Sequence, residues 1–208
     1  MGSTQRSLFS RAQLAQPERR KRGRPKLKGA GLPHTRRPAV DPRRPHHVTI
    51  RMRRGVWNLR SQRCFRPITE ALRAVRKAGQ GFRVVHFSVQ GNHMHLVTEA
   101  DDRRAMTRGM RALLIRVAKQ LNRVMGAEGR VFADRFHERV LGTAREVRNV
   151  VRYVLGNHAH HLAQVGKAHL AAEVDDFSSA NPSLDSPKVG PPWSRPESWL
   201  LRVGWRRV

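Results

Sequence analysis

The segment from Phe82 to Glu99 limits the possible folds more than any other part of the chain. Two apolar, β-branched runs flank the turn residues Gly91 and Asn92, a pattern that predicts a β-hairpin. The second strand opens with a His-x-His motif, and because side chains two apart on a strand share a face, His93 and His95 can converge on one cation. With 11 histidines in 208 residues, such motifs also arise by chance, and a second one is present further on. The motif therefore needs a partner elsewhere in the chain before it indicates a metal site.

The neighbouring segments predict the order of elements around this hairpin. Residues 46–53 alternate and predict a strand, and residues 67–78 carry a helical apolar stripe that stops at glycine. After the hairpin, Asp101 or Asp102 caps a long helix, and residues 131–141 again predict a strand. The order β-α-β-β-α-β is the ferredoxin-like plan. We therefore expect an α+β fold, with a four-stranded antiparallel sheet and two helices on one face.

A further helix should cover the free face of this sheet. Thr143 and Glu146 form a capping box, and the apolar residues that follow recur at helical spacing. Tyr153, the only tyrosine in the chain, and Asn157 lie one turn apart on a flank of that stripe. The second His-x-His motif comes directly after Asn157, and on a continuing helix its two side chains point to nearly opposite sides. The first motif is therefore the candidate for a metal-binding pair.

The charge of the chain indicates a polyanionic partner. It carries 42 lysines and arginines against 15 acids, a net charge of +27, and arginines far outnumber lysines. Guanidinium groups suit phosphates and guanine edges, which favours nucleic acid over a membrane surface. A basic, ribosome-associated protein without a specialised site is the alternative on charge alone.

Cysteine content and hydropathy limit the kinds of metal site and the cellular location that we expect for the protein. Cys64 is the only cysteine, which excludes an internal disulfide and a thiolate metal cluster. The chain has neither an apolar run of membrane-spanning length nor a signal-peptide core. We therefore expect a cytoplasmic, nucleoid-associated protein that does not enter a membrane.

The two ends of the chain differ in composition from the middle. Residues 1–45 are basic and proline-rich, which predicts a disordered arm, and residues 166–208 predict a linker followed by a tryptophan-containing tail. The tryptophans either dock on the domain or stack on bases. Part of the arm resembles the AT-hook, which binds the minor groove of A/T-rich duplex DNA, although a solvated basic tail is the alternative. The residues of this AT-hook-like motif are Arg22, Gly23, Arg24 and Pro25.

The predicted long helix has a second candidate DNA-binding surface opposite its apolar face. Its side chains either contact phosphates or form an ordinary solvated face. The basic residues of this surface are Arg104, Arg108, Arg111 and Lys119.

Taken together, the His-x-His strand and the tyrosine helix resemble a known family. A strand with His-hydrophobe-His, a ferredoxin-like order and a helix with Tyr-x-x-x-Asn are similar to the HUH single-tyrosine transposases, which include the REP-associated tyrosine transposases. The similarity covers roughly residues 46–160, and we place the corresponding domain at residues 46–165. Two residues depart from the family pattern. Gly156 weakens the helix by roughly 1 kcal/mol relative to alanine, and His158 stands where many relatives have proline.

The resemblance implies a role for each candidate residue. His93 and His95 would bind a divalent metal ion, Mg²⁺ or Mn²⁺, Asn157 would complete the metal site, and Tyr153 would be the nucleophile. The implied activity is cleavage and strand transfer of single-stranded or hairpin DNA through a 5′-phosphotyrosine, by a monomer or a homodimer. This is the activity of the transposase of an insertion sequence or of a domesticated relative.

Two other functions stay open at this point. One is a non-catalytic nucleic-acid-binding protein on the same sheet plan, which RNA-recognition domains share, although their aromatic signature is absent here. The other is a decayed transposase that binds DNA without cutting it.

Overall fold

The computed structural model describes residue 37, residues 39–164, residues 166 and 169, and residues 174–208. All of them lie in the unit Gly31–Val208. The AT-hook-like motif lies outside the described residues. The strands are β1 (His46–Arg51), β2 (Phe82–Val89), β3 (His93–Ala100) and β4 (His137–Val140). The α-helices are α1 (Gln62–Ala78), α2 (Arg103–Met125), α3 (Ala144–Gln164) and α4 (Trp199–Arg202), and two 3-10 helices are η2 (Pro182–Leu184) and η3 (Gly204–Arg206).

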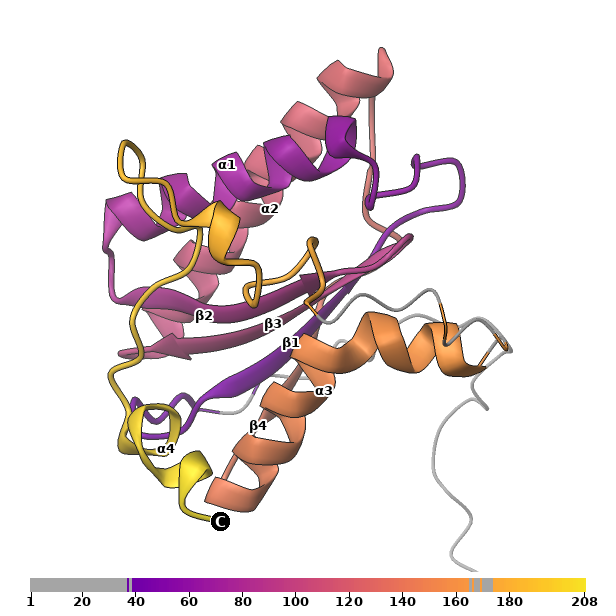
Figure 1. The fold of residues 1–208 in the computed structure, drawn as a ribbon. Coiled ribbons are helices and arrows are strands. Elements are labelled where there is room, and N and C mark those ends of the chain that lie inside the picture. Colours follow the sequence, from indigo (N-terminus) through magenta and orange to yellow (C-terminus); the bar gives the residue numbers. More distant parts are fainter. Residues whose placement is uncertain (1–36, 38, 165, 167–168, 170–173) are drawn as a thin grey trace, which may run out of the picture. The chain divides into compact units, whose positions relative to one another are not determined.

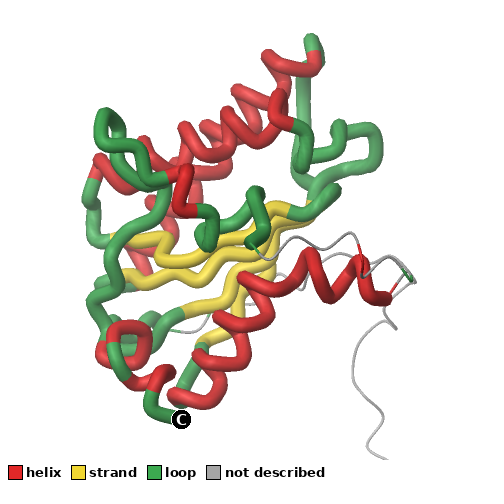
Figure 2. Tube along the Cα trace, viewed as in Figure 1, coloured by secondary structure: helices red, strands yellow, loops and turns green. Residues whose placement is uncertain are grey.

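The four strands form one sheet in the order β2-β3-β1-β4, and every neighbouring pair is antiparallel. Figure 1 shows α1 and α2 on one face of the sheet and α3 on the other, and Figure 2 shows the same layers by type of secondary structure. The predicted α+β fold with a four-stranded antiparallel sheet is therefore confirmed.

Helices α1 and α2 bury the larger core against the sheet. The side chain of Ser61 caps α1 by accepting a hydrogen bond from the backbone N–H of Cys64. For this reason the helix begins before Pro67, where the apolar stripe had suggested its start. Gly79 ends α1 and Gly126 ends α2, both in the left-handed conformation that glycine adopts at little cost.

Helix α3 covers part of the second face with a smaller core of its own. The predicted capping box is present: Thr143 Oγ1 accepts from the backbone N–H of Glu146, and Glu146 Oε2 accepts from that of Thr143, both at 3.2 Å. The helix continues through both histidines of the second His-x-His motif to Gln164. At about 100° per residue, those two side chains leave the helix in nearly opposite directions.

Strand β4 is shorter than the predicted strand at residues 131–141. Before it, only an isolated bridge between Met52 and Phe132 joins this segment to the end of β1. At the next turn, the Asp134 carboxylate accepts a hydrogen bond from the backbone N–H of Arg135 at 2.7 Å. Such local side-chain bonds compete with ladder pairing, so the regular strand begins only at His137.

A buried ionic network ties β4 to β1 and α2. Glu138 receives bidentate hydrogen bonds from Arg103 at 2.9 and 3.0 Å and one from Arg37 at 2.9 Å, and its Oε1 lies 2.8 Å from Nδ1 of His46. Burial would raise the pKa of Glu138, but the hydrogen bonds from His46, Arg103 and Arg37 outweigh it and lower this pKa to about 2.

The C-terminal segment runs along the outer edge of β2. The backbone N–H of Val89 donates to the carbonyl of Phe177, and that of Ser179 donates to the carbonyl of Phe87. This pairing covers an edge that would otherwise present unpaired backbone groups. Trp193 and Trp205 pack against the two cores, whereas Trp199 is 57% exposed.

None of the helices in the described parts of the chain is both long and apolar enough to span a membrane.

Candidate functional site

The central contact of the site joins helix α3 to strand β3 across the second face of the sheet. The hydroxyl of Tyr153 lies 3.4 Å from Nε2 of His95, and the two rings meet edge to face with centroids 5.2 Å apart. His95 is buried, at 5% exposed, whereas Tyr153 is 41% exposed. The phenol oxygen of Tyr153 therefore lies beside a buried imidazole, while the rest of the Tyr153 side chain is partly exposed to solvent.

His93 lies at the start of β3 on the same face as His95. The two imidazole centroids are 4.8 Å apart, and the rings are nearly perpendicular. Nδ1 of His93 is 2.8 Å from the side-chain oxygen of Asn92. Because an amide oxygen only accepts hydrogen bonds, Nδ1 of His93 is the donor in this contact. The two imidazole rings are therefore neighbours on one face of the sheet.

A third histidine, His47 of strand β1, supports the orientation of His95. Nδ1 of His95 lies 3.1 Å from Nε2 of His47 and 3.2 Å from the hydroxyl of Thr49. The His47 and His95 rings also stack, with centroids 5.2 Å apart. Burial, together with the nearby charges of His137 and Arg139, lowers the pKa of His47 to about 4, so its imidazole is neutral at pH 7.

Neutral His47 is able to accept the Nδ1 proton of His95. That bond leaves the lone pair on Nε2 of His95, the nitrogen that faces the Tyr153 hydroxyl. His47 was not among the predicted site residues, because the alternating pattern of residues 46–53 does not show which residues of the neighbouring strand they pair with. The one signal that could have indicated His47 was the pairing of β1 with β3, which the ferredoxin-like order implies.

Asn157 is the fourth predicted residue of the site, one turn after Tyr153. Its side chain is completely buried, and within the described part of the chain neither its oxygen nor its nitrogen has a hydrogen-bond partner. Gly156 does not interrupt α3, which runs on to Gln164. A buried amide without partners costs roughly 1–3 kcal/mol, so this position calls for a ligand or a function.

The donor set is compatible with a divalent cation only if it includes this amide. Among the described residues, no group of three or more His, Cys, Asp and Glu side chains is arranged to hold a metal ion. Two imidazoles and one amide oxygen form a set of a different kind. The unpartnered amide of Asn157 fits such a role, and so does Nε2 of His95, the nitrogen that faces the Tyr153 hydroxyl.

The predicted basic surface of α2 lies apart from this cluster. Its side chains are exposed on the helix layer that covers the opposite face of the sheet, so the structure does not bring them to Tyr153. The surface consists of Arg104, Arg108, Arg111 and Lys119.

Comparison with known proteins identifies solved structures that have a similar fold. No protein-family model matches the chain, and no curated protein is similar to it in sequence. Among solved structures, the chain is similar to a REP-associated tyrosine transposase bound to a REP hairpin, with a TM-score of 0.54 and 16% identity over 80% of this chain and 93% of that one. At this level of identity the similarity establishes the fold.

Two further structures show weaker similarity. A protein of Deinococcus radiodurans R1, provisionally described as a transposase, gives a TM-score of 0.39 and 13% identity over 73% of this chain and 99% of that one. A bacterial tRNA(His) guanylyltransferase-like protein in complex with GTP gives a TM-score of 0.45 and 11% identity, and it covers 65% of this chain and 72% of that one.

Proposed function

We propose that this protein is a DNA transposase of the HUH single-tyrosine type, which cleaves and rejoins single-stranded DNA with Tyr153 as its nucleophile. The observation that carries the proposal is the 3.4 Å contact between the Tyr153 hydroxyl and Nε2 of His95. It unites two motifs that lie far apart in the sequence, on the face of a sheet whose fold is shared with a REP-associated tyrosine transposase.

The reaction conserves the number of phosphoester bonds and needs no external energy source. The phenol oxygen of Tyr153 attacks the scissile phosphorus, and the bond from phosphorus to the 3′ oxygen breaks. The phenol loses a proton and the 3′ oxygen gains one, which leaves a 5′-phosphotyrosine and a free 3′-hydroxyl. Since a phenoxide with a pKa near 10 is a competent leaving group, another 3′-hydroxyl can later displace Tyr153 and complete strand transfer.

His93, His95 and Asn157 are the residues that would hold a divalent ion, Mg²⁺ or Mn²⁺. Such an ion supplies Lewis acidity at the phosphate oxygens and a template for the scissile bond. The protein itself orients the metal ligand His95 and the nucleophile Tyr153. His47 holds the imidazole of His95 in one tautomer and one orientation, and α3 presents the Tyr153 oxygen from the open side of the sheet.

The proposed substrate is single-stranded or hairpin DNA. The solved relative was bound to a REP hairpin, and the net charge of +27 favours a polyanion. We further propose that the AT-hook-like arm adds affinity for A/T-rich duplex DNA next to the cleavage site. Deletion of residues 1–36, which spares Arg37 and its ion pair with Glu138, should weaken binding and flatten its salt dependence, whereas cleavage of a saturating substrate should remain.

A covalent-adduct assay tests the function. The full chain is incubated with Mn²⁺ and single-stranded DNA carrying candidate hairpin ends, and the mixture is denatured before electrophoresis. The wild-type chain should give a denaturation-resistant protein–DNA species, and Tyr153→Phe should give none. If the wild-type chain binds these substrates tightly but forms no adduct under any divalent ion, the protein is a DNA-binding module without the proposed chemistry.

A further inference from the structure

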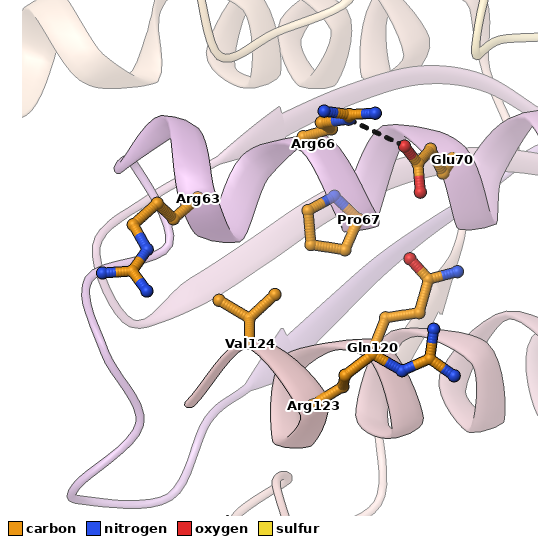
Figure 3. Close-up of a pocket in the computed structure, with 7 residues that line it drawn as sticks. All are labelled: Arg63, Arg66, Pro67, Glu70, Gln120, Arg123 and Val124. Atoms are coloured by element: carbon orange, nitrogen blue, oxygen red, sulfur yellow. Dashed lines mark hydrogen bonds and ion pairs between the residues drawn. The ribbon is translucent and has the colours of Figure 1, made fainter. Parts of the chain in front are cut away.

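An open groove lies between α1 and α2, on the side of the sheet opposite Tyr153. Its volume is about 610 Å³, and its walls carry charged and polar side chains from both helices. Figure 3 shows Arg63, Arg66 and Glu70 on α1 across from Gln120 and Arg123 on α2. No part of the site described above uses these residues.

The groove carries positive charge that its own acid does not neutralise. Glu70, the single acidic residue of its lining, forms an exposed i,i+4 ion pair with Arg66 at 3.0 Å. Within the described ranges, no carboxylate forms an ion pair with Arg63 or Arg123, which come from opposite walls. Two guanidinium groups that flank one groove favour an anion between them, and a phosphate can accept forked hydrogen bonds from each.

An exposed aromatic ring extends this surface at one end. Trp57, in the loop between β1 and α1, is 42% exposed, and the guanidinium carbon of Arg63 lies 5.1 Å from its ring centroid. Packing in the core does not account for an indole in this position. An arginine-lined groove beside a solvent-facing aromatic ring is the arrangement by which proteins bind single-stranded nucleic acid, with phosphates on the cations and a base on the ring.

The groove and the Tyr153 site lie at the same end of the sheet, on opposite faces. The loop that carries Trp57 is fixed to the β2–β3 turn, which immediately precedes His93. The backbone N–H of Leu59 donates to the carbonyl of Gly91 at 3.0 Å, and that of Met52 donates to the carbonyl of Asn92 at 2.9 Å. Helix α1 begins three residues after Leu59, close to this turn, whereas α2 ends further from the sheet (Figure 1). A single DNA strand that passes over the β2–β3 turn from the Tyr153 side therefore reaches Trp57 first and the groove next.

We propose that the α1–α2 groove binds the phosphodiester backbone of single-stranded DNA, while Trp57 stacks on one of its bases. The inference rests on the proposed function only for the identity of the polyanion. A single strand fits the geometry because arginines from both walls can contact one backbone, and because stacking on Trp57 requires an unpaired base.

A salt titration of DNA binding tests the groove. Binding of a labelled single-stranded oligonucleotide is measured by fluorescence anisotropy in chelator, on the Tyr153→Phe background, so that no cleavage takes place. The triple variant R63A/R66A/R123A should bind at least tenfold more weakly. Its salt dependence should fall by about 2 in the slope of log K against log salt, since each single-strand phosphate contact contributes about 0.7. In the same assay, W57A should lower affinity about tenfold with no change in slope.

A matched variant separates the groove from the general charge of the protein. K188A/R202A/R207A removes the same number of positive charges from exposed positions outside the groove, and it should change affinity less than threefold. Thermal unfolding of both triple variants should match that of the parent, because all six residues are exposed. Equal losses in the two triple variants would overturn the proposal, as would an unchanged affinity in W57A or an equal loss on blunt duplex DNA. Because the assay needs neither metal nor Tyr153, it can fail while adduct formation succeeds, or the reverse.

Discussion

The Tyr153 hydroxyl and the Nε2 atom of His95 lie 3.4 Å apart, although helix α3 and strand β3 are separated by a helix, a strand and their loops. The contact places the only tyrosine of the chain against the second histidine of the His-x-His motif. It links the proposed nucleophile to a candidate metal ligand.

Removal of the histidine pair should abolish metal binding. We expect H93A/H95A to lower Mn²⁺ affinity more than 100-fold, because two of the three proposed ligands are lost, and to prevent adduct formation. The second His-x-His motif offers a matched control, H158A/H160A, which removes two histidines from α3 with the same spacing. Mn²⁺ titration by electron paramagnetic resonance measures both variants. Similar losses in the two pairs would show that the chain binds Mn²⁺ at histidines in general.

His47 should act through His95. Replacement by phenylalanine keeps the ring volume but removes the acceptor for Nδ1 of His95, and it should weaken Mn²⁺ binding about 10- to 100-fold. His47→Gln supplies an amide oxygen and should recover part of that affinity. Thr49→Val removes the other neighbour of Nδ1. If T49V weakens Mn²⁺ binding and H47F does not, Thr49 is the orienting residue.

We expect Asn157 to lower the stability of the fold and to be needed for metal binding. Its buried amide has no partner within the described part of the chain, so Asn157→Leu, which has a similar volume, should raise the free energy of unfolding in metal-free buffer by roughly 1–3 kcal/mol. The same variant should lose Mn²⁺ binding and adduct formation. Urea denaturation with and without Mn²⁺ measures both effects. A destabilised, metal-binding N157L would mean that the amide has a structural role.

Acid should destabilise the fold through Glu138. Its pKa is lowered to about 2 in the folded chain, against 4.5 for an ordinary glutamate, so its contribution to stability is complete above pH 4.5 and is lost as the pH falls toward 2. Glu138→Gln should reduce the fall in melting temperature over that range. It should also lower stability at pH 7, because the ion pair between Arg103 and Glu138 is lost. Thermal melts at a series of pH values test this, and an unchanged pH dependence would contradict it.

Local signals made the sheet plan predictable, and local signals also indicated the candidate site residues. The hairpin at Gly91, the capping box at Thr143 and the spacing from Tyr153 to Asn157 each depend on neighbouring residues only, and the structure contains all three elements. His47 was not predictable because its role depends on the register between two strands that are distant in sequence. The charge that Arg63 and Arg123 bring to one groove likewise depends on how two helices pack.

The most direct test of the central claim is to identify the residue that carries the DNA. The adduct formed with Mn²⁺ is digested with nuclease and trypsin, and the remaining nucleotide-bearing peptide is sequenced by mass spectrometry. We expect a 5′-linked phosphonucleotide on Tyr153, within the peptide of residues 153–167 that starts after Arg152. A nucleotide on any other residue, or an adduct of equal yield in Tyr153→Phe, would contradict it.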